Sequence, residues 1–198
     1  MNRIQSILLA ITIAQTFNIC AQENGDPKKL AFGFNFGLNY SQLYNGKATD
    51  ELGLHNDVGF RLGVISSYRL NEKYSLLPKA ELSFNNGTVT KDLTSYTIYK
   101  SSLDAMVHFK YSYGSRKNKF YLFAGPAFRM PLNDQSADFK TIGSIALDCG
   151  FGIDLITKNF KISPEFRISG GLMDVRANPT GNQLRFSNFA LIINFSPL

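Results

Sequence analysis

The chain has 198 residues and a formal net charge of +6, with 17 Phe, 9 Tyr, 16 Gly and no Trp. This length suits a single domain, and the mild basic excess forms no run or helical stripe that would indicate nucleic-acid binding. Abundant aromatic residues and glycines favour strands joined by tight turns over helices. We therefore expect an all-β protein with no nucleic-acid partner.

The first residues have the features of a secretory signal peptide. Arg3 supplies a basic start, and residues 4–14 form an apolar stretch that is too short to span a bilayer. Cleavage after Ala21 fits the small-residue rule, whereas Cys20 lacks the small preceding residue that lipoprotein processing needs. We expect residues 1–21 to be removed, which leaves 22–29 as a short periplasmic segment.

Few residues remain that could ligate a metal. After removal of the signal peptide, Cys149 would be the only cysteine, and His55 and His108 are the only histidines. One cysteine excludes an internal disulfide and a multi-cysteine metal site. We expect no metal, no cofactor and no disulfide.

Apolar and polar residues alternate with period two from residue 30 onward, whereas helical periodicity is weak. No later segment has 18 consecutive apolar residues, so we expect no transmembrane helix. The eight longest alternating runs cover residues 30–40, 58–69, 74–84, 102–111, 120–129, 144–155, 160–168 and 188–195. They predict eight antiparallel strands within residues 30–198.

The connections between these runs alternate in length. Three are short turns, at residues 71–73, 114–119 and 158–159. The other four are polar loops of about ten residues, near 45–57, 86–95, 131–140 and 173–183. Short turns at one rim and longer loops at the other are typical of a transmembrane β-barrel. We predict an eight-stranded antiparallel up-and-down barrel with short periplasmic turns and four longer extracellular loops.

The residue types on each face indicate which face points inward. The polar face is rich in Gly, Ser and Asn, which suits a crowded interior better than a water-exposed surface. Tyrosines gather at both strand ends, as in interfacial aromatic belts: Tyr68, Tyr74, Tyr111 and Tyr113 at one end, Tyr40, Tyr44, Tyr96 and Tyr99 at the other. We therefore expect a monomeric barrel in the outer membrane of a Gram-negative bacterium, with its apolar face against lipid. The alternative, a soluble lipocalin-like binding barrel, would turn that face inward.

Three segments resemble a known family. YSLLPKAELSFNNG (74–87), SLDAMVHFKY with KFYLFAGPAFR (102–129) and FKISPEFRISGG (160–171) are similar to the small outer-membrane β-barrel family of Bacteroidetes, the PorT-like outer membrane protein beta-barrel domain. The resemblance covers nearly the whole chain after the signal peptide and implies the same fold and location. One member of that family assists type IX secretion and gliding, so the resemblance also implies a protein partner in the envelope or secretion machinery. It brings no catalytic motif.

Charged residues on the polar faces are expected to fill the barrel interior as ion pairs, because buried charges need partners that offset their desolvation. The candidates are Arg61, Lys79, Glu81, Asp104, His108, Asp148, Asp154, Glu165 and Arg167.

The short turns set the register of two hairpins. A two-residue turn at 158–159 places Gly152 opposite Glu165 and Gly150 opposite Arg167. We expect these glycines to leave room for the two long side chains, and Asp148, diagonal to Arg167, to pair with it.

The other hairpin is expected to have the same arrangement of a glycine opposite a long charged side chain. The turn at 71–73 places Gly63 opposite Glu81, with Arg61 diagonal to Glu81.

Two strands also resemble each other. YSLLPKAELS aligns with FKISPEFRIS, which places Pro78 over Pro164 and reverses the signs of the two charges that follow each proline. Both prolines lie on the apolar face and lack an amide donor, so each predicts a bulge or a gap in the strand pairing.

A lipid-modifying outer-membrane barrel enzyme is the competing hypothesis. Such an enzyme needs a His–Ser or His–acid arrangement near a rim. Asp104 lies four residues before His108 on the same face and could orient its imidazole, but no motif marks a nucleophilic serine. Asp148 and Asp154 could hold a cation, but ion pairing inside the barrel is the explanation that we favour. We predict a non-enzymatic barrel with a structural or binding role through its loops or surface.

Overall fold

The computed structural model describes residues 30–45, 53–55, 57–84, 88–91, 94–97, 101–114, 118–132, 143–173 and 184–197. The predicted signal peptide and segment 22–29 lie outside these ranges, so both stay predictions. Within the described residues, no helix is long and apolar enough to cross a membrane.

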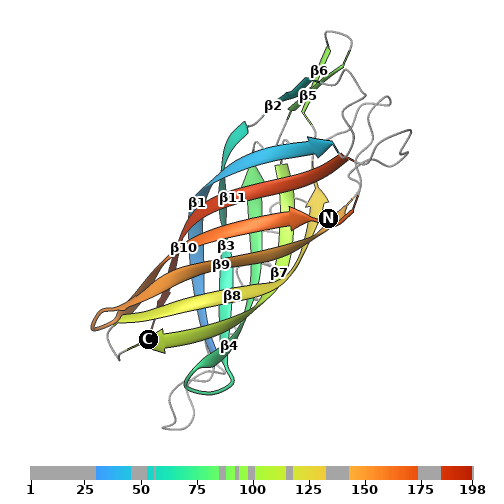
Figure 1. The fold of residues 1–198 in the computed structure, drawn as a ribbon. Coiled ribbons are helices and arrows are strands. Elements are labelled where there is room, and N and C mark those ends of the chain that lie inside the picture. Colours follow the sequence, from blue (N-terminus) through green and yellow to red (C-terminus); the bar gives the residue numbers. More distant parts are fainter. Residues whose placement is uncertain are drawn as a thin grey trace, which may run out of the picture.

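Eight long strands close into one antiparallel barrel (Figure 1). They are β1 (Leu30–Asn45), β3 (Asp57–Arg69), β4 (Tyr74–Phe84), β7 (Ser101–Gly114), β8 (Asn118–Pro131), β9 (Ser144–Ile156), β10 (Phe160–Gly171) and β11 (Leu184–Pro197). Around the barrel the order is β1-β11-β10-β9-β8-β7-β4-β3, and β3 pairs again with β1. Each strand contains one of the eight predicted runs, so the predicted fold class is confirmed.

A second, three-stranded sheet was not predicted. It has the order β2-β5-β6, with β2 (Gly53–His55), β5 (Thr88–Lys91) and β6 (Thr94–Thr97). These strands lie in segments that the sequence indicated only as polar loops between β1 and β3 and between β4 and β7. Figure 1 shows the sheet beyond one end of the barrel, which we call the loop end.

The opposite rim, the short-turn end, carries tight turns. Between β3 and β4, the Leu70 and Asn71 amides donate to the Tyr74 carbonyl at 3.0 and 3.2 Å. Between β9 and β10, the Thr157 amide donates to the Phe160 carbonyl at 2.9 Å, which confirms the predicted turn at 158–159. The first residue of β1 and the last of β11 reach the same rim, since Leu30 pairs with Tyr68 and Pro197 with Phe160.

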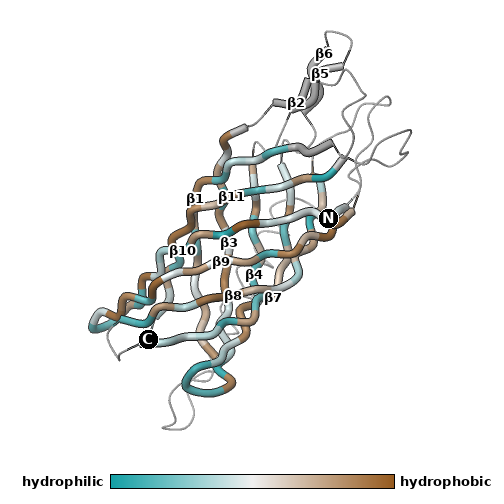
Figure 2. The backbone as a smooth tube through the Cα atoms, viewed as in Figure 1, coloured by the Kyte–Doolittle hydropathy of each residue, from teal (hydrophilic) through white to brown (hydrophobic). Residues whose placement is uncertain are grey.

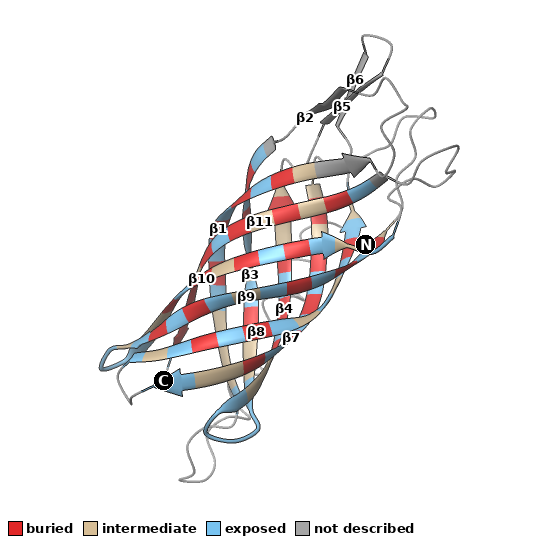
Figure 3. Cartoon of the chain, in the orientation of Figure 1, coloured by how far each residue is buried: buried red, intermediate tan, exposed pale blue. Residues whose placement is uncertain are grey.

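The barrel is polar inside and apolar outside. Figure 2 shows hydrophobic and hydrophilic residues alternating along the strands, and Figure 3 shows exposed and buried residues alternating along the same strands. Outward-facing Leu38 and Leu191 are 61% and 63% exposed, whereas inward-facing Arg61 and Arg167 are 1% and 0% exposed. A soluble binding barrel requires the reverse arrangement, so that alternative is wrong.

Each proline in the interior of a strand interrupts the pairing with one neighbour. The β3–β4 pairing passes from Ile65↔Lys79 to Tyr68↔Leu76 without including Pro78, and it resumes in the same register. The β9–β10 pairing omits Pro164 in the same way, and the β7–β8 pairing omits Pro126. Because the register does not shift, the predicted irregularities at Pro78 and Pro164 are gaps and not bulges.

Candidate functional site

Five charged side chains form a connected chain across the barrel interior. Arg61 donates to Glu81 at 3.0 Å, Arg167 donates to Glu81 at 2.9 and 3.0 Å and to Glu165 at 2.9 Å, and Lys79 donates to Glu165 at 2.8 Å. None of the five is more than 4% exposed. Each carboxylate therefore contacts two cations, which offsets the cost of removing it from water.

The chain of charges joins opposite walls of the barrel. Strands β4 and β10 are separated by three strands in either direction around the barrel. Lys79 of β4 meets Glu165 of β10, and Glu81 of β4 meets Arg167 of β10. The sign reversal between β4 and β10 is therefore what makes their charges complementary across the interior.

Three further pairs lie around this chain. His108 Nε2 lies 3.0 Å from Asp148 Oδ2, Lys110 Nζ donates to Asp154 Oδ2 at 2.6 Å, and Arg129 donates to both oxygens of Asp104 at 3.0 Å.

The structure thus places all nine predicted interior residues inside the barrel. One predicted pairing is wrong, because Asp148 contacts His108 and forms no ion pair with Arg167. Asp104 contacts Arg129, so it does not orient His108 in the way that the enzyme hypothesis considered.

The buried charges of the described residues balance. The cations are Arg61, Lys79, Lys110, Arg129 and Arg167, and the anions are Glu81, Asp104, Asp148, Asp154 and Glu165. Lys110 and Arg129 were missing from the predicted set, although each lies on the polar face of a predicted strand. Strand parity alone could have found them.

Comparisons with known proteins agree with a barrel of this kind. A family model described as the outer membrane protein beta-barrel domain matches residues 14–177. The chain belongs to this family. No curated protein matches the chain.

The chain is also similar to solved structures of outer-membrane proteins. Neisserial surface protein A matches with a TM-score of 0.52 and 15% sequence identity, covering 82% of this chain and 95% of that one. OprG from Pseudomonas aeruginosa matches with a TM-score of 0.48 and 13% identity over 85% and 93%. Ail of Yersinia pestis, in complex with the heparin analogue sucrose octasulfate, matches with a TM-score of 0.44 and 11% identity over 85% and 99%. The protein is an outer-membrane barrel of a Gram-negative bacterium.

The glycines of this outer-membrane barrel make room for aromatic rings as well as for charges. The predicted registers Gly152↔Glu165, Gly150↔Arg167 and Gly63↔Glu81 are confirmed. A Cβ added at Gly63 would lie 2.7 Å from Glu81 Cγ, as expected for space given to a long side chain.

At Gly150 and Gly152 the expectation about what fills the space is wrong. There the added Cβ would overlap the rings of Phe123 and Tyr121, which enter from β8 on the other side of β9. Tyr121 donates to Glu165 Oε2 at 3.2 Å, and the Phe123 ring stacks on His108 with centroids 4.8 Å apart. The glycines thus allow rings to line the charged chain.

Replacing Gly152 with Ala is expected to destabilise the barrel by about 1–3 kcal/mol, because the methyl group must displace the Tyr121 ring from its contact with Glu165. The midpoint of urea unfolding, followed by circular dichroism in lipid vesicles, measures the change. Gly170→Ala is the matched control, since its added Cβ would meet nothing closer than the Leu147 carbonyl at 4.0 Å. Equal midpoints for the two variants would contradict the role given to Gly152.

The one histidine whose surroundings are described is buried. His108 is 0% exposed and lies between Asp148 and the Phe123 ring. A lipid-modifying enzyme needs a catalytic group that lipid can reach near a rim, and His108 does not meet that requirement in this position. Among the described residues, no group of three or more His, Cys, Asp or Glu side chains could hold a metal ion.

Proposed function

We propose that this outer-membrane barrel has a non-enzymatic structural or binding role, in which a rigid and internally filled barrel presents its loop end to a partner protein. The observation that carries the proposal is the ion-pair chain from Arg61 to Lys79, which occupies the interior from wall to wall. A pathway for solutes would require these pairs to separate, which leaves charges buried without partners. A filled interior therefore favours a function at one end of the barrel over transport through it.

The loop end is the more elaborate of the two ends. The strands of the second sheet come from two different connections, and Leu54↔Val89 joins them across the rim. A connection that needed only to join neighbouring strands would not require its own sheet, whereas loops held by a rigid barrel are where binding surfaces commonly lie. This supports contact with a partner from the outside of the cell.

An accessory role in protein secretion is the specific form of this proposal. It rests on the resemblance of the segments around Pro78 and Pro164 to the PorT-like family of Bacteroidetes, one member of which assists type IX secretion. The barrel would act as a single copy that holds a component of the envelope or secretion machinery.

Site-specific photo-crosslinking in intact cells tests the proposal. A photoreactive residue in place of Thr90, in β5 at the loop end, is expected to form a covalent adduct with a protein. The control carries the same residue at Asn71, in the exposed β3–β4 turn, and is expected to form none. Both variants must retain the heat-modifiable gel migration of a folded barrel. Adducts from Asn71 alone would move the binding surface to the periplasmic side, and a lack of adducts from both would contradict a protein partner at either end.

A further inference from the structure

A groove crosses the outer face of the barrel over the neighbouring strands β3, β1, β11, β10 and β9 (Figure 1). Its volume is about 690 Å³. Three consecutive residues of each strand line it, in that order 60–62, 36–38, 191–193, 164–166 and 151–153. The groove lies on the side of the barrel and not at its loop end, so the proposed function makes no use of it.

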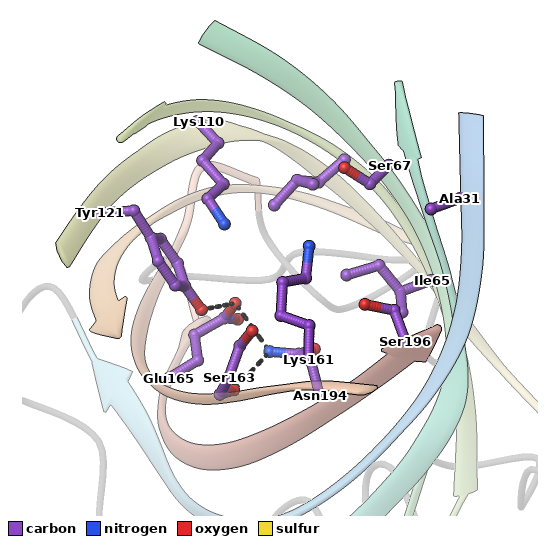
Figure 4. A pocket seen from close by; sticks show the side chains of 11 residues that line it. Ala31, Ile65, Ser67, Lys110, Tyr121, Lys161, Ser163, Glu165, Asn194 and Ser196 are labelled. Carbon is purple, nitrogen blue, oxygen red and sulfur yellow. Dashed lines mark hydrogen bonds between the residues drawn. The ribbon is translucent and has the colours of Figure 1, made fainter. Parts of the chain in front are cut away.

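The groove differs from the small hollow inside the barrel near the short-turn end (Figure 4). That hollow has a volume of about 20 Å³, which suits a single water molecule. Figure 4 shows polar and charged side chains around it, among them Lys110, Glu165 and Asn194. Of these two spaces, only the outer groove has room for a molecule larger than water.

The strand registers explain the shape of the groove. One wall is a row of outward-facing residues that pair from strand to strand, namely Phe60, Leu38, Leu191, Phe166 and Phe151. The other wall lies two residues away along each strand, and the backbone between the walls forms the floor. The groove therefore runs across the strands, and the usual strand spacings make it about 19 Å long and about 7 Å wide.

Aromatic pairs hold both ends of the groove in place. At the β3 end, Phe60 stacks on Phe84 of β4 with ring centroids 4.7 Å apart. At the β9 end, Phe151 packs against Phe166 with centroids 5.5 Å apart. Ring pairs of this kind stabilise each other beyond the area that they bury, so the walls are formed before a ligand arrives.

The opposite side of the barrel lacks such walls. Its strands β4, β7 and β8 direct Ala80, Ala105 and Ala124 outward in the middle of the barrel. A methyl group rises little above the backbone, whereas the Phe and Leu side chains of the groove rise well above it. Lipid tails on this side therefore meet a flatter surface, with which the groove can be compared.

The chemistry, depth and width of the groove select its ligand. Every side chain that the five strands contribute to either wall is apolar, and the floor residues are paired with neighbouring strands. Leu191 lies in the middle of β11, at the depth of the hydrocarbon core, which polar headgroups do not reach. A transmembrane helix, about 10 Å or more across, is too wide for the groove. An extended hydrocarbon chain is narrower and needs no hydrogen bond.

We propose that this groove binds an acyl chain of a membrane lipid in a defined position, unlike the lipids that exchange freely around the rest of the barrel. The chain lies across the strands, with Leu38 and Leu191 in one wall and Phe36 and Ile193 in the other. Lipid tails are as apolar as the groove, so closer van der Waals packing is what favours the bound chain.

Carbene crosslinking from a phosphatidylcholine with a diazirine in the middle of one acyl chain tests the proposal. The full chain is folded in phosphatidylcholine vesicles that contain a small proportion of this probe, and mass spectrometry assigns the adducts to residues. Leu38 and Leu191 of the groove are compared with Leu122 and Leu147, which are outward-facing, lie outside it and are similarly exposed. The groove leucines are expected to form about threefold more adducts, a modest excess because packing alone distinguishes the bound chain.

Phe36→Ala removes part of one wall in the middle of the groove and should abolish this excess. Phe128→Ala is the matched control, because Phe128 is an outward-facing ring of β8 that lies outside the groove. It should retain the excess. Both variants must show the heat-modifiable gel migration of a folded barrel.

Several results would overturn the proposal. Equal adduct yields at the four leucines of the unaltered chain would mean that only freely exchanging lipid covers the groove, and an excess that persists in Phe36→Ala would separate it from the walls. Fewer adducts at Leu38 and Leu191 than at the other two leucines would mean that protein, such as a second copy of the chain, covers the groove. An excess with a diazirine-labelled free fatty acid but not with the phospholipid would indicate a different source of the chain. If Phe36→Ala does not fold, the comparison of the four leucines in the unaltered chain decides.

Discussion

Replacing Arg167 with Met is expected to destabilise the folded barrel by about 3–5 kcal/mol, the range for removing one partner from a buried ion pair. Arg167 alone contacts both Glu81 and Glu165, and it is 0% exposed. Without it, Glu81 keeps Arg61, Glu165 keeps Lys79, and the two carboxylates lose the cation between them. The midpoint of urea unfolding in lipid vesicles, followed by circular dichroism, measures the loss.

Two variants separate this effect from a general intolerance of substitution. Lys79→Met should cost less than Arg167→Met, because Glu165 retains Arg167, Tyr121 and Asn194. Adding Glu81→Gln and Glu165→Gln to Arg167→Met should lower the stability further, since Arg61 and Lys79 would then be buried without the carboxylates that pair with them. An Arg167→Met barrel that unfolds at the same urea concentration as the unaltered chain would refute the central role of Arg167.

Strand parity explains how much of the interior could be predicted. The same period of two that marks Leu191 as outward-facing marks Arg167 as inward-facing, and the tight turn at 158–159 sets the β9–β10 register. Hairpin register follows from local sequence, so the pairing of Gly152 with Glu165 was predictable. The interior location of the nine predicted residues rests on the same local pattern.

The partner of each interior charge could not be predicted in this way. Arg167 pairs with Glu81, which is 86 residues away in the chain and lies on the opposite wall. That contact depends on how the sheet closes, on the stagger between strands and on which long side chains reach the axis. The sequence-based expectation considered neighbours within one hairpin, and it therefore assigned Arg167 to Asp148.

The prediction about the side chains that fill the space beside the glycines was wrong for a related reason. The prediction for Gly150 and Gly152 considered only β10, whereas each strand of a closed barrel has two neighbours. The rings of Phe123 and Tyr121 arrive from β8, whose register depends on a separate turn. The second sheet was missed because β5 and β6 have only four residues each, which is short for a strand assigned from periodicity.

The reversed charges after Pro78 and Pro164 have a physical explanation that one sequence could not supply. Two strands on opposite walls can share a motif only if their inward charges are complementary, because like charges facing each other in a closed interior would both lack partners. The pairs Lys79–Glu165 and Glu81–Arg167 satisfy that condition. Complementarity across the barrel is sufficient to explain the relation between the two segments.

Leu191→Arg is expected to destabilise the barrel by about 2–4 kcal/mol in lipid vesicles, the range for a charge placed on the lipid face near the bilayer midplane. Leu191 is 63% exposed in the middle of β11, and it pairs with Leu38 and Phe166, which also lie on the outer face. On a water-exposed surface the same substitution would be almost neutral, because neither an exposed leucine nor an exposed arginine contributes much to the stability of the fold. The urea midpoint therefore reports which solvent this face contacts.

Leu172→Arg provides the matched control. Leu172 is 56% exposed, but it follows the last residue of β10 at the loop end, where a long cationic side chain can reach the membrane surface. Its expected cost is about 0–1 kcal/mol. A large difference in destabilisation between the two variants requires a surrounding solvent whose polarity changes along the barrel axis. A bilayer has that property, and water does not. Equal and small costs at both positions would mean that water covers the apolar face, which would contradict the membrane-spanning arrangement.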